Sequence, residues 1–236
     1  MTKPFPQNHK ARGALSNNAG RFEPYETVRQ DDGWGCDIEN DASLCVEVRH
    51  EAARSAVTYN SSPDLPFDRS VNPYRGCEHG CIYCFARPSH AFLGLSPGLD
   101  FETRLIARPN IADVLRRELA SSRYVPAVIA IGTNTDPYQP IDRDLRLMRK
   151  CLEVLAGAKH PVAIVTKGTL IERDLDILQD MARDGLVRVG ISVTTRDPDV
   201  SRKMEPRAPS PRRRMQTIER IAAAGVEVRV MASPMV

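Results

Sequence analysis

The sequence reads Asn72-Pro73-Tyr74-Arg75-Gly76-Cys77-Glu78-His79-Gly80-Cys81-Ile82-Tyr83-Cys84 where its cysteines are most crowded. Three cysteines in eight mostly polar residues are not the pattern of a hydrophobic core. Gly76 and Gly80 lack a Cβ, so the backbone here can fold tightly around an ion or a cluster. Soft thiolate ligands suit zinc or iron–sulfur clusters, and the segment therefore predicts a metal centre.

The cysteine spacing leaves two kinds of metal centre open. Zinc would need a fourth ligand, and His79 or His90 would complete a tetrahedral Cys3His site. That alternative predicts a zinc-stabilised nucleic-acid-binding protein without catalysis. Structural zinc sites usually pair ligands from two separated knuckles, however, and no second cysteine pair lies nearby. Three thiolates without an obvious fourth would instead leave one iron of a four-iron cluster open.

Beyond the cysteines, short runs rich in Val and Ile alternate with amphipathic segments. The runs are typical of strands buried on both faces: 125–131, 161–166, 186–193 and 226–231. Apolar stripes predict helices within 111–119, 141–155, 171–182 and 211–225. Gly185 is placed to end the third helix, and Ser210-Pro211 to begin the fourth. Strand–helix alternation predicts an α/β fold with a parallel sheet, either open and doubly wound or a barrel.

Polar residues follow each of the predicted strands. They are Thr133-Asn134-Thr135-Asp136, Thr166-Lys167, Ser192 with Thr194, and Ser233. In both α/β architectures the active site lies beyond the carboxyl ends of the strands. Four polar sets around one rim favour a site for a polar ligand.

The motif Cys-x3-Cys-x2-Cys, with aromatic Tyr83 before the last cysteine, resembles the signature of the radical S-adenosylmethionine (SAM) superfamily. Thr135–Pro140 and Met204–Arg207 are similar to the branch that includes spore photoproduct lyase and the "DNA repair photolyase"-like proteins. The resemblance runs from about residue 50 to 236. It implies a partial TIM-type (β/α) barrel of parallel strands, in which residues 68–74 form the first strand and its exit.

The resemblance also implies cofactors and their ligands. Cys77, Cys81 and Cys84 would hold a [4Fe-4S] cluster whose open iron binds the amino and carboxylate groups of SAM. Further SAM contacts would be Tyr83 near the adenine, Asn134 and Asp136 near the amino group, Lys167 near the carboxylate, and Ser192 and Thr194 near the ribose and carboxylate. The superfamily's Gly-Gly-Glu is absent after the second strand, where this chain has Asn134 and Asp136.

The implied activity is that of a lyase-like iron–sulfur enzyme. It would cleave SAM reductively to a 5′-deoxyadenosyl radical that abstracts hydrogen from an unknown substrate, with nucleic acid as one class. A one-electron donor such as flavodoxin or ferredoxin would be its partner. In spore photoproduct lyase, as the resemblance has it, a cysteine beyond the second strand returns a hydrogen atom. Residues 132–136 contain no thiol, so we predict that the chain does not repair the thymine dimer by that route and that its substrate differs.

Composition limits the location and the domain organisation. No apolar run approaches the roughly 18 residues of a membrane helix, and Met1–Pro6 does not resemble a secretory signal, so we expect a cytoplasmic protein with reduced thiols. Residues 1–45 hold few aliphatic side chains and predict a poorly ordered extension, with the catalytic core in 46–236. Because the superfamily has six strand–helix units, we expect a barrel truncated after the fifth strand, its C-terminal part missing.

Overall fold

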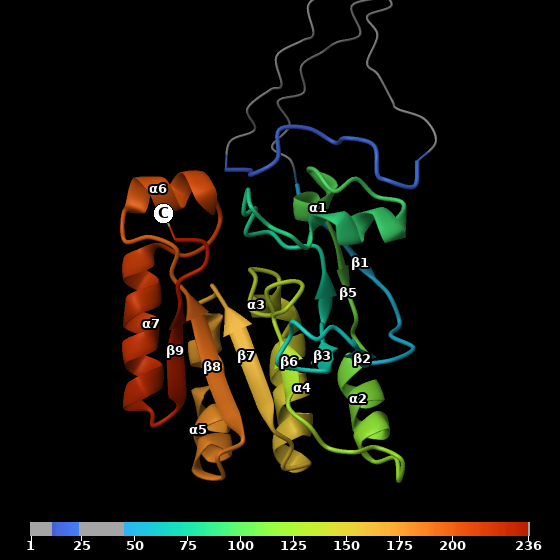
Figure 1. Ribbon diagram of the computed structural model, residues 1–236, viewed down its shortest axis with the longest axis vertical. Helices are drawn as coiled ribbons and strands as arrows, with labels where there is room; N and C mark the ends of the chain where they lie inside the picture. The colour runs from blue at the N-terminus through green and yellow to red at the C-terminus, as the bar shows by residue number, and fades with distance from the viewer. Residues whose placement is uncertain (1–10, 24–44, 236) are drawn as a thin grey trace, which may run out of the picture.

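A mixed β-sheet lies at the centre of the protein, for which the computed structural model describes residues 11–23 and 45–235 (Figure 1). Within these residues its six strands are ordered β2-β3-β6-β7-β8-β9. Their bounds are β2 (Val57–Tyr59), β3 (Arg69–Val71), β6 (Ile129–Ile131), β7 (Val162–Thr166), β8 (Val187–Ser192) and β9 (Glu227–Met231). Only β2 runs antiparallel to its neighbour. The predicted α/β fold with mostly parallel strands is therefore confirmed, while truncation after β9 stays a prediction.

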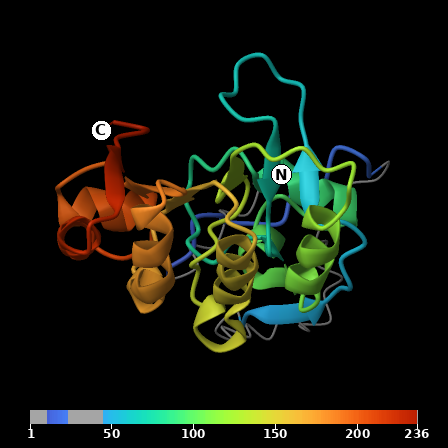
Figure 2. The same cartoon turned by 90° about the horizontal axis from the view of Figure 1, so that it is seen from below.

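Amphipathic helices cover one face of this sheet, as the view from below shows (Figure 2). They are α2 (Ile111–Leu119), α4 (Leu147–Gly157), α5 (Leu175–Arg183) with the preceding 3-10 turn η2 (Leu170–Asp174), and α7 (Pro211–Ala223). Their apolar stripes and the strands share one large core. Two predicted helix ends are confirmed: the Ser210 hydroxyl accepts a hydrogen bond from the Arg213 N–H, and Gly185 follows α5 with a φ of 68°.

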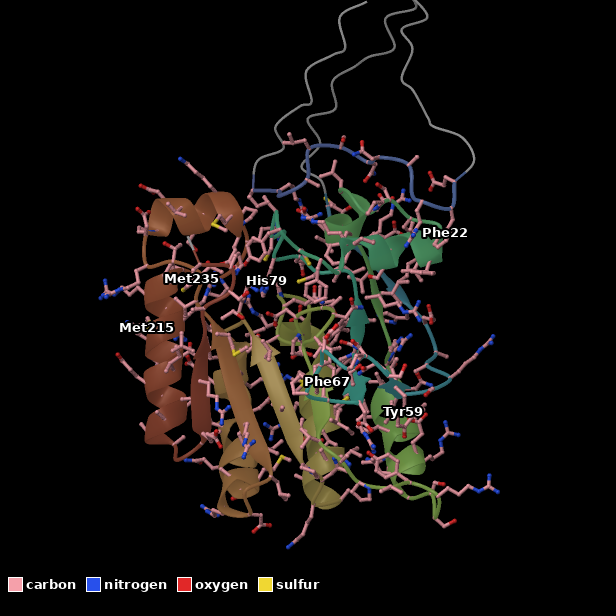
Figure 3. All side chains as sticks on the ribbon, in the orientation of Figure 1. Phe22, Tyr59, Phe67, His79, Met215 and Met235 are labelled. Carbon is pink, nitrogen blue, oxygen red and sulfur yellow. The ribbon has the colours of Figure 1, made fainter. Side chains whose placement is uncertain are left out.

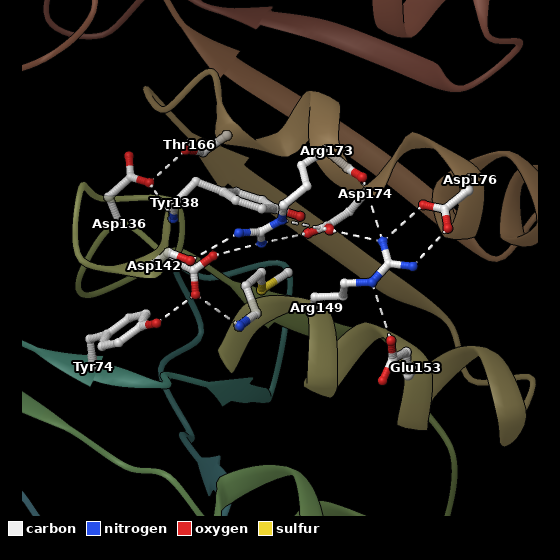
Figure 4. Close-up of polar contacts among 11 residues, drawn as sticks. Tyr74, Asp136, Tyr138, Asp142, Arg149, Glu153, Thr166, Arg173, Asp174 and Asp176 are labelled. Carbon is white, nitrogen blue, oxygen red and sulfur yellow. Dashed lines mark hydrogen bonds and ion pairs between the residues drawn. The ribbon is translucent and has the colours of Figure 1, made fainter. Parts of the chain in front are cut away.

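The predicted helix over 141–155 is divided in two, which corrects the sequence-based expectation. A short α3 (Asp142–Leu145) ends at Arg146, whose φ of 52° is left-handed, and α4 begins directly after it. The cause is the buried Asp142 carboxylate, which accepts hydrogen bonds from the Tyr74 hydroxyl (2.5 Å), the Met148 N–H (3.1 Å) and Arg173 (2.8 Å) (Figure 4). A helix continued through residue 146 would break this buried network.

The first predicted parallel run is also shorter than expected. Strand β6 begins at Ile129 and not at Val125. Pro126 lacks an N–H for the sheet ladder, and the Val125 side chain is 72% exposed. Residues 125–128 therefore form a loop before the strand.

A second, smaller sheet lies beside the cysteine segment and was not predicted. It contains β1 (Glu47–His50), β5 (Arg104–Ala107) and β4 (Tyr74–Arg75) in the order β1-β5-β4. Three short helices complete the described fold: η1 (Arg87–Leu93), α1 (Asp100–Thr103) and α6 (Pro198–Met204). Strand β4 leads directly into the cysteine loop, so this sheet sets the direction from which the loop begins. None of the described helices is long and apolar enough to cross a membrane.

The predicted poorly ordered extension falls partly outside the described residues, which omit 1–10 and 24–44. Residues 11–23, by contrast, lie across α1 and the loops around it (Figure 1). Asn17 and Asp100 exchange two hydrogen bonds of 2.9 Å each. The segment is therefore held by polar contacts to residues far away in the chain, which hydrophobic periodicity cannot reveal.

Glu172 links η2 to α7 and leads to a prediction about acid stability. Its carboxylate accepts hydrogen bonds from Arg213 (2.6 and 2.9 Å), Thr217 (2.6 Å) and Arg220 (2.5 Å). Burial opposes ionisation, but these donors outweigh it and lower the pKa of Glu172 to about 2. We expect Glu172→Gln to reduce the free energy of unfolding by about 1 kcal/mol at pH 7.

The sign of the pH dependence follows from that lowered pKa. The unfolded-state pKa is about 4.3, so the ionised carboxylate stabilises the folded state above this pH. The stabilisation is lost as the pH falls from about 4.3 towards the folded-state pKa of about 2. Urea unfolding of both proteins between pH 7 and pH 2.5 measures the difference. A difference that does not shrink below pH 4 contradicts the prediction.

Candidate functional site

The cysteine loop lies at the carboxyl end of the parallel strands, where the fold class places active sites. Cys77 and Cys81 are buried, Cys84 is half-buried, and all three are free thiols. The two glycines have positive φ angles, 77° at Gly76 and 66° at Gly80. A Cβ at Gly76 would lie 2.9 Å from the Phe101 carbonyl oxygen. The tight turn expected from these glycines is confirmed.

Burial governs the protonation of these thiols. It raises the pKa of Cys77 well above its usual value and that of Cys81 to about 12. The backbone N–H groups of His79 and Asp136 hydrogen-bond Cys77 and oppose the increase. Without a bound cation the Cys77 and Cys81 thiols are therefore protonated at neutral pH, and metal binding must displace these two protons.

Gln139, which is fully buried, connects the loop to the segment after β6. Its side-chain amide donates to the Gly76 carbonyl (3.1 Å) and accepts from the Glu78 N–H (3.0 Å). Glu78 in turn accepts from the Ile141 N–H at 3.1 Å. These bonds fix the backbone on either side of Cys77.

The segment Met204–Arg207 holds the other half of the loop. The Ile82 N–H donates to the Met204 carbonyl (3.0 Å), and the Arg207 N–H donates to the His79 carbonyl (3.2 Å). The Arg207 guanidinium also donates to Glu78 at 3.0 Å. The two segments that carry the resemblance to the radical SAM branch, the cysteine loop and Met204–Arg207, are therefore in direct contact.

Tyr83 and Glu205 continue this contact into the protein interior. The Tyr83 hydroxyl donates to the buried Glu205 carboxylate, which also accepts from Arg214. The Lys167 ammonium lies 5.7 Å from the centre of the Tyr83 ring. Burial and the neighbouring Cys81 raise the pKa of Tyr83, so its phenol is neutral at physiological pH. The Tyr83 hydroxyl is thus hydrogen-bonded within the protein, while one face of its ring lies beside Lys167.

Asp136 has a different environment from the one expected of a SAM ligand. Its Oδ1 accepts from the Tyr138 N–H (2.9 Å) and the Thr166 hydroxyl (2.5 Å), and its Oδ2 from the Lys167 N–H (2.7 Å). His79 Nδ1 lies 3.3 Å from Oδ2, within ion-pair distance but without hydrogen-bond geometry. Burial opposes ionisation, yet His79 and these donors lower the pKa of Asp136. Its contact with SAM stays a prediction. A SAM amino group would have to compete with these hydrogen bonds for the carboxylate oxygens.

The other predicted SAM contacts come from neighbouring strand ends on the same edge of the sheet. Ser192 ends β8 and Thr194 follows it, both buried, while Asn134 and Lys167 are half-buried beyond β6 and β7. The Ser192 carbonyl accepts from Arg214 at 2.9 Å. The topology thus brings these four residues to the edge that carries the cysteine loop. Their contacts with SAM remain predictions.

Three thiols on one loop are the donor set that an iron–sulfur cluster needs. Across residues 11–23 and 45–235, no three His, Cys, Asp or Glu side chains are grouped to hold one metal ion. A cluster distributes its thiolates over separate irons, so its ligands need not converge on one point. His79 Nδ1 lies 3.3 Å from Asp136 Oδ2, and His90 Nε2 lies 2.9 Å from the Arg104 carbonyl oxygen, while the buried His90 Nδ1 has no hydrogen-bond partner among the described residues. Figure 3 shows His79 near the carboxyl ends of the central strands.

Three thiols on one loop at the carboxyl edge of a mostly parallel α/β sheet are the arrangement expected of proteins that bind a metal centre through thiolates. Residues 71–236 match the sequence profile of the Radical SAM superfamily. The chain belongs to this superfamily, whose members are enzymes.

The curated relatives are uncharacterised proteins. One from Mycobacterium tuberculosis is 43% identical over 170 residues, which cover 72% of this chain and 50% of the relative. Another from Methanocaldococcus jannaschii is 22% identical over 166 residues, covering 70% of this chain and 60% of the relative. The chain thus spans about half the length of the curated mycobacterial relatives it matches.

Solved structures of spore photoproduct lyase share the fold. The complex with dinucleoside spore photoproduct has a TM-score of 0.60 at 18% identity, over 79% of this chain and 51% of that one. A double mutant with bound AdoMet and the same ligand has a TM-score of 0.59 at 18% identity, over the same shares. Identity this low supports the fold alone, and the fold resembles the partial barrel of radical SAM proteins.

Proposed function

We propose that the chain is an iron–sulfur enzyme that binds a [4Fe-4S] cluster through Cys77, Cys81 and Cys84 and cleaves SAM reductively. One observation carries the proposal: three free thiols lie on a loop that is hydrogen-bonded on both sides, at the carboxyl edge of the parallel strands. When bound, the cluster would supply one electron to SAM, yielding methionine and a 5′-deoxyadenosyl radical that abstracts a substrate hydrogen atom.

The chain's own residues would bind the cluster and exclude water from it. Cys77 and Cys81 are buried before any cofactor is added, and N–H groups hydrogen-bond the Cys77 sulfur. Such hydrogen bonds and low solvent exposure are what set a cluster's reduction potential. Lys167 and Ser192, at the ends of β7 and β8, would orient the polar end of SAM.

Nucleic acid is the substrate class that we propose to test. The fold is similar to that of spore photoproduct lyase in complex with a dinucleoside. Residues 196–214 include seven Lys and Arg side chains, which could bind phosphate groups. They support this class less than their number suggests, because Arg207, Arg213 and Arg214 form ion pairs with carboxylates of the same chain. The exposed basic side chains that remain are Arg196, Arg202, Lys203 and Arg212. A cytoplasmic flavodoxin or ferredoxin would be the electron donor.

Anaerobic reconstitution with iron and sulfide tests the proposal. A brown chain with about four irons that forms 5′-deoxyadenosine from SAM and dithionite is the expected result. A colourless chain with one tightly held zinc would instead identify the zinc-stabilised nucleic-acid-binding alternative.

A second prediction concerns the substrate itself. Residues Gly132–Asp136 contain no cysteine to return a hydrogen atom to a thymine radical. We therefore expect no clean conversion of dinucleotide spore photoproduct to thymine when the reconstituted chain is incubated with SAM and dithionite. SAM cleavage in the same sample is the internal control. Stoichiometric conversion of the photoproduct to the undamaged thymine dinucleotide would contradict the prediction.

A further inference from the structure

Residues 11–23 form a segment, here called the strap, that lies directly on the cysteine loop. A Cβ built at Gly13 would be 1.8 Å from the Gly80 carbonyl oxygen, so the two backbones are in close contact. Gly80 lies between two of the predicted cluster ligands, Cys77 and Cys81. Only a residue without a side chain can occupy position 13 while the strap keeps this contact.

Glu102, whose side chain is fully buried, holds the strap in place. Its carboxylate accepts hydrogen bonds from two strap N–H groups, those of Gly13 (3.1 Å) and Ala14 (2.9 Å). The Arg12 guanidinium donates to the Glu102 backbone carbonyl at 3.2 Å. A buried carboxyl group is unfavourable unless it is hydrogen-bonded, so the two strap N–H groups stabilise the Glu102 side chain in its buried position.

The same carboxylate reaches a predicted cluster ligand through Arg87. The Arg87 guanidinium donates to Glu102 at 2.6 Å. Its Nε and Nη2 atoms also donate to the Cys81 carbonyl oxygen, at 3.2 and 2.9 Å. One buried carboxylate thus fixes a guanidinium that fixes the backbone of Cys81.

Further contacts fasten the rest of the strap to the region between η1 and α1. The Leu99 N–H donates to the Ser16 carbonyl (3.2 Å), and the Ser96 hydroxyl donates to the Asn18 carbonyl (2.6 Å). At the end of the strap, the Phe22 ring lies 4.9 Å from that of Phe92, and Figure 3 shows Phe22 at this outer edge. The strap is therefore held along its whole length.

We propose that Glu102 is the positioning residue for Cys81, acting through Arg87, and that the strap covers this side of the cluster-binding loop against water and oxygen. The inference rests on the proposed function, because it assigns the Cys81 side of the loop to the cluster. The strap contributes no residue to the large hydrophobic core of the six-stranded sheet.

Glu102→Gln in the full chain tests the positioning role. The amide keeps the size of the side chain but brings an NH2 group against donors from the strap and Arg87, so the loop is held less firmly. We expect altered g values in the electron paramagnetic resonance spectrum of the reduced cluster. We also expect about tenfold faster bleaching in air, since loss of a charge-assisted hydrogen bond raises the open population by about this factor.

Glu172→Gln is the matched control, because it removes a hydrogen-bonded carboxylate that pairs with arginines away from the cysteine loop. It should leave the g values and the bleaching rate unchanged. Wild-type g values and bleaching in Glu102→Gln, at equal iron content, would overturn the positioning role.

A pair of glycine variants tests the strap without any cluster. A Cβ at Gly13 would collide with the Gly80 backbone, whereas a Cβ at Gly20 would meet the Ala91 side chain at 3.3 Å. In the cluster-free full chain we expect Gly13→Ala to raise iodoacetamide labelling of Cys81 about tenfold, as local opening exposes a buried thiol. Gly20→Ala should match the wild type, with the modified sites read by peptide mass spectrometry.

The two failures can be told apart. Equal labelling of Cys81 in the two glycine variants would overturn the proposal that the strap covers the loop, whether or not the chain binds a cluster. A wild-type chain that takes up no iron while Gly13→Ala still exposes Cys81 would refute the proposed function and leave the strap as a cover over the loop.

Discussion

Replacing Cys77, Cys81 or Cys84 by alanine is expected to reduce the iron content of the reconstituted chain to background and to abolish formation of 5′-deoxyadenosine. Two thiolates cannot hold a cluster in the geometry that leaves one iron open for SAM. The loop backbone is fixed from both sides by Gln139 and by Met204–Arg207, so a neighbouring group cannot move in as a substitute ligand. Iron and sulfide per chain, measured after anaerobic reconstitution, check the expectation.

Cys151 provides the control for this series. It is completely buried in the core between α4 and the sheet, and burial raises its pKa to about 12. Cys151→Ala removes one sulfur atom from that core and should cost about 1–2 kcal/mol of stability. Its iron content should equal that of the wild type. Loss of iron in this variant alone would contradict the ligand assignment.

The parts of the fold that could be predicted are those with local or periodic signals. The Val-rich run 161–166 became β7, and the cap at Ser210-Pro211 began α7 where expected. Each signal depends on residues within a few positions of one another. Tertiary contacts therefore stabilise a strand or helix that the local sequence already favours. The cysteine spacing is local in the same sense.

The strap and the short helices around it carry no such signal. Their order comes from single polar contacts between distant residues, such as Glu102 with Gly13, 89 positions apart. A polar, glycine-containing segment has the same composition whether it is solvated or hydrogen-bonded to a buried carboxylate. Only the three-dimensional partner distinguishes the two, and a single sequence does not contain that pairing.

The same limit applies to charged residues near the site. Arg214 stands in a basic run and is nonetheless completely buried, because Glu205 and the Ser192 carbonyl accept its hydrogen bonds. Asp136, at a strand end, was expected to face SAM, yet both of its oxygens are engaged by the protein. Position at the rim of a sheet therefore identifies candidates, and their hydrogen bonds decide which remain available.

Asp136→Ala should accordingly reduce the stability of the folded protein, and any loss of SAM binding should follow from that. The carboxylate joins the cysteine loop at His79 to the exit of β7 at Thr166 and Lys167. Its removal leaves buried donors without an acceptor, for which the usual loss is about 3–5 kcal/mol. We expect the free energy of unfolding in urea at pH 7 to fall by about 3 kcal/mol, with iron uptake reduced because the loop loses its contact with β7.

Asn134→Ala is the matched comparison at the same strand end. Asn134 is half-buried, so a bound SAM molecule can replace water at its amide. Its truncation should leave the free energy of unfolding within about 0.5 kcal/mol of the wild type and weaken SAM binding, measured by calorimetry on the reconstituted chain. If Asp136→Ala instead keeps its full stability and loses only SAM affinity, then Asp136 is the SAM ligand and its bonds to Thr166 and Lys167 are incidental.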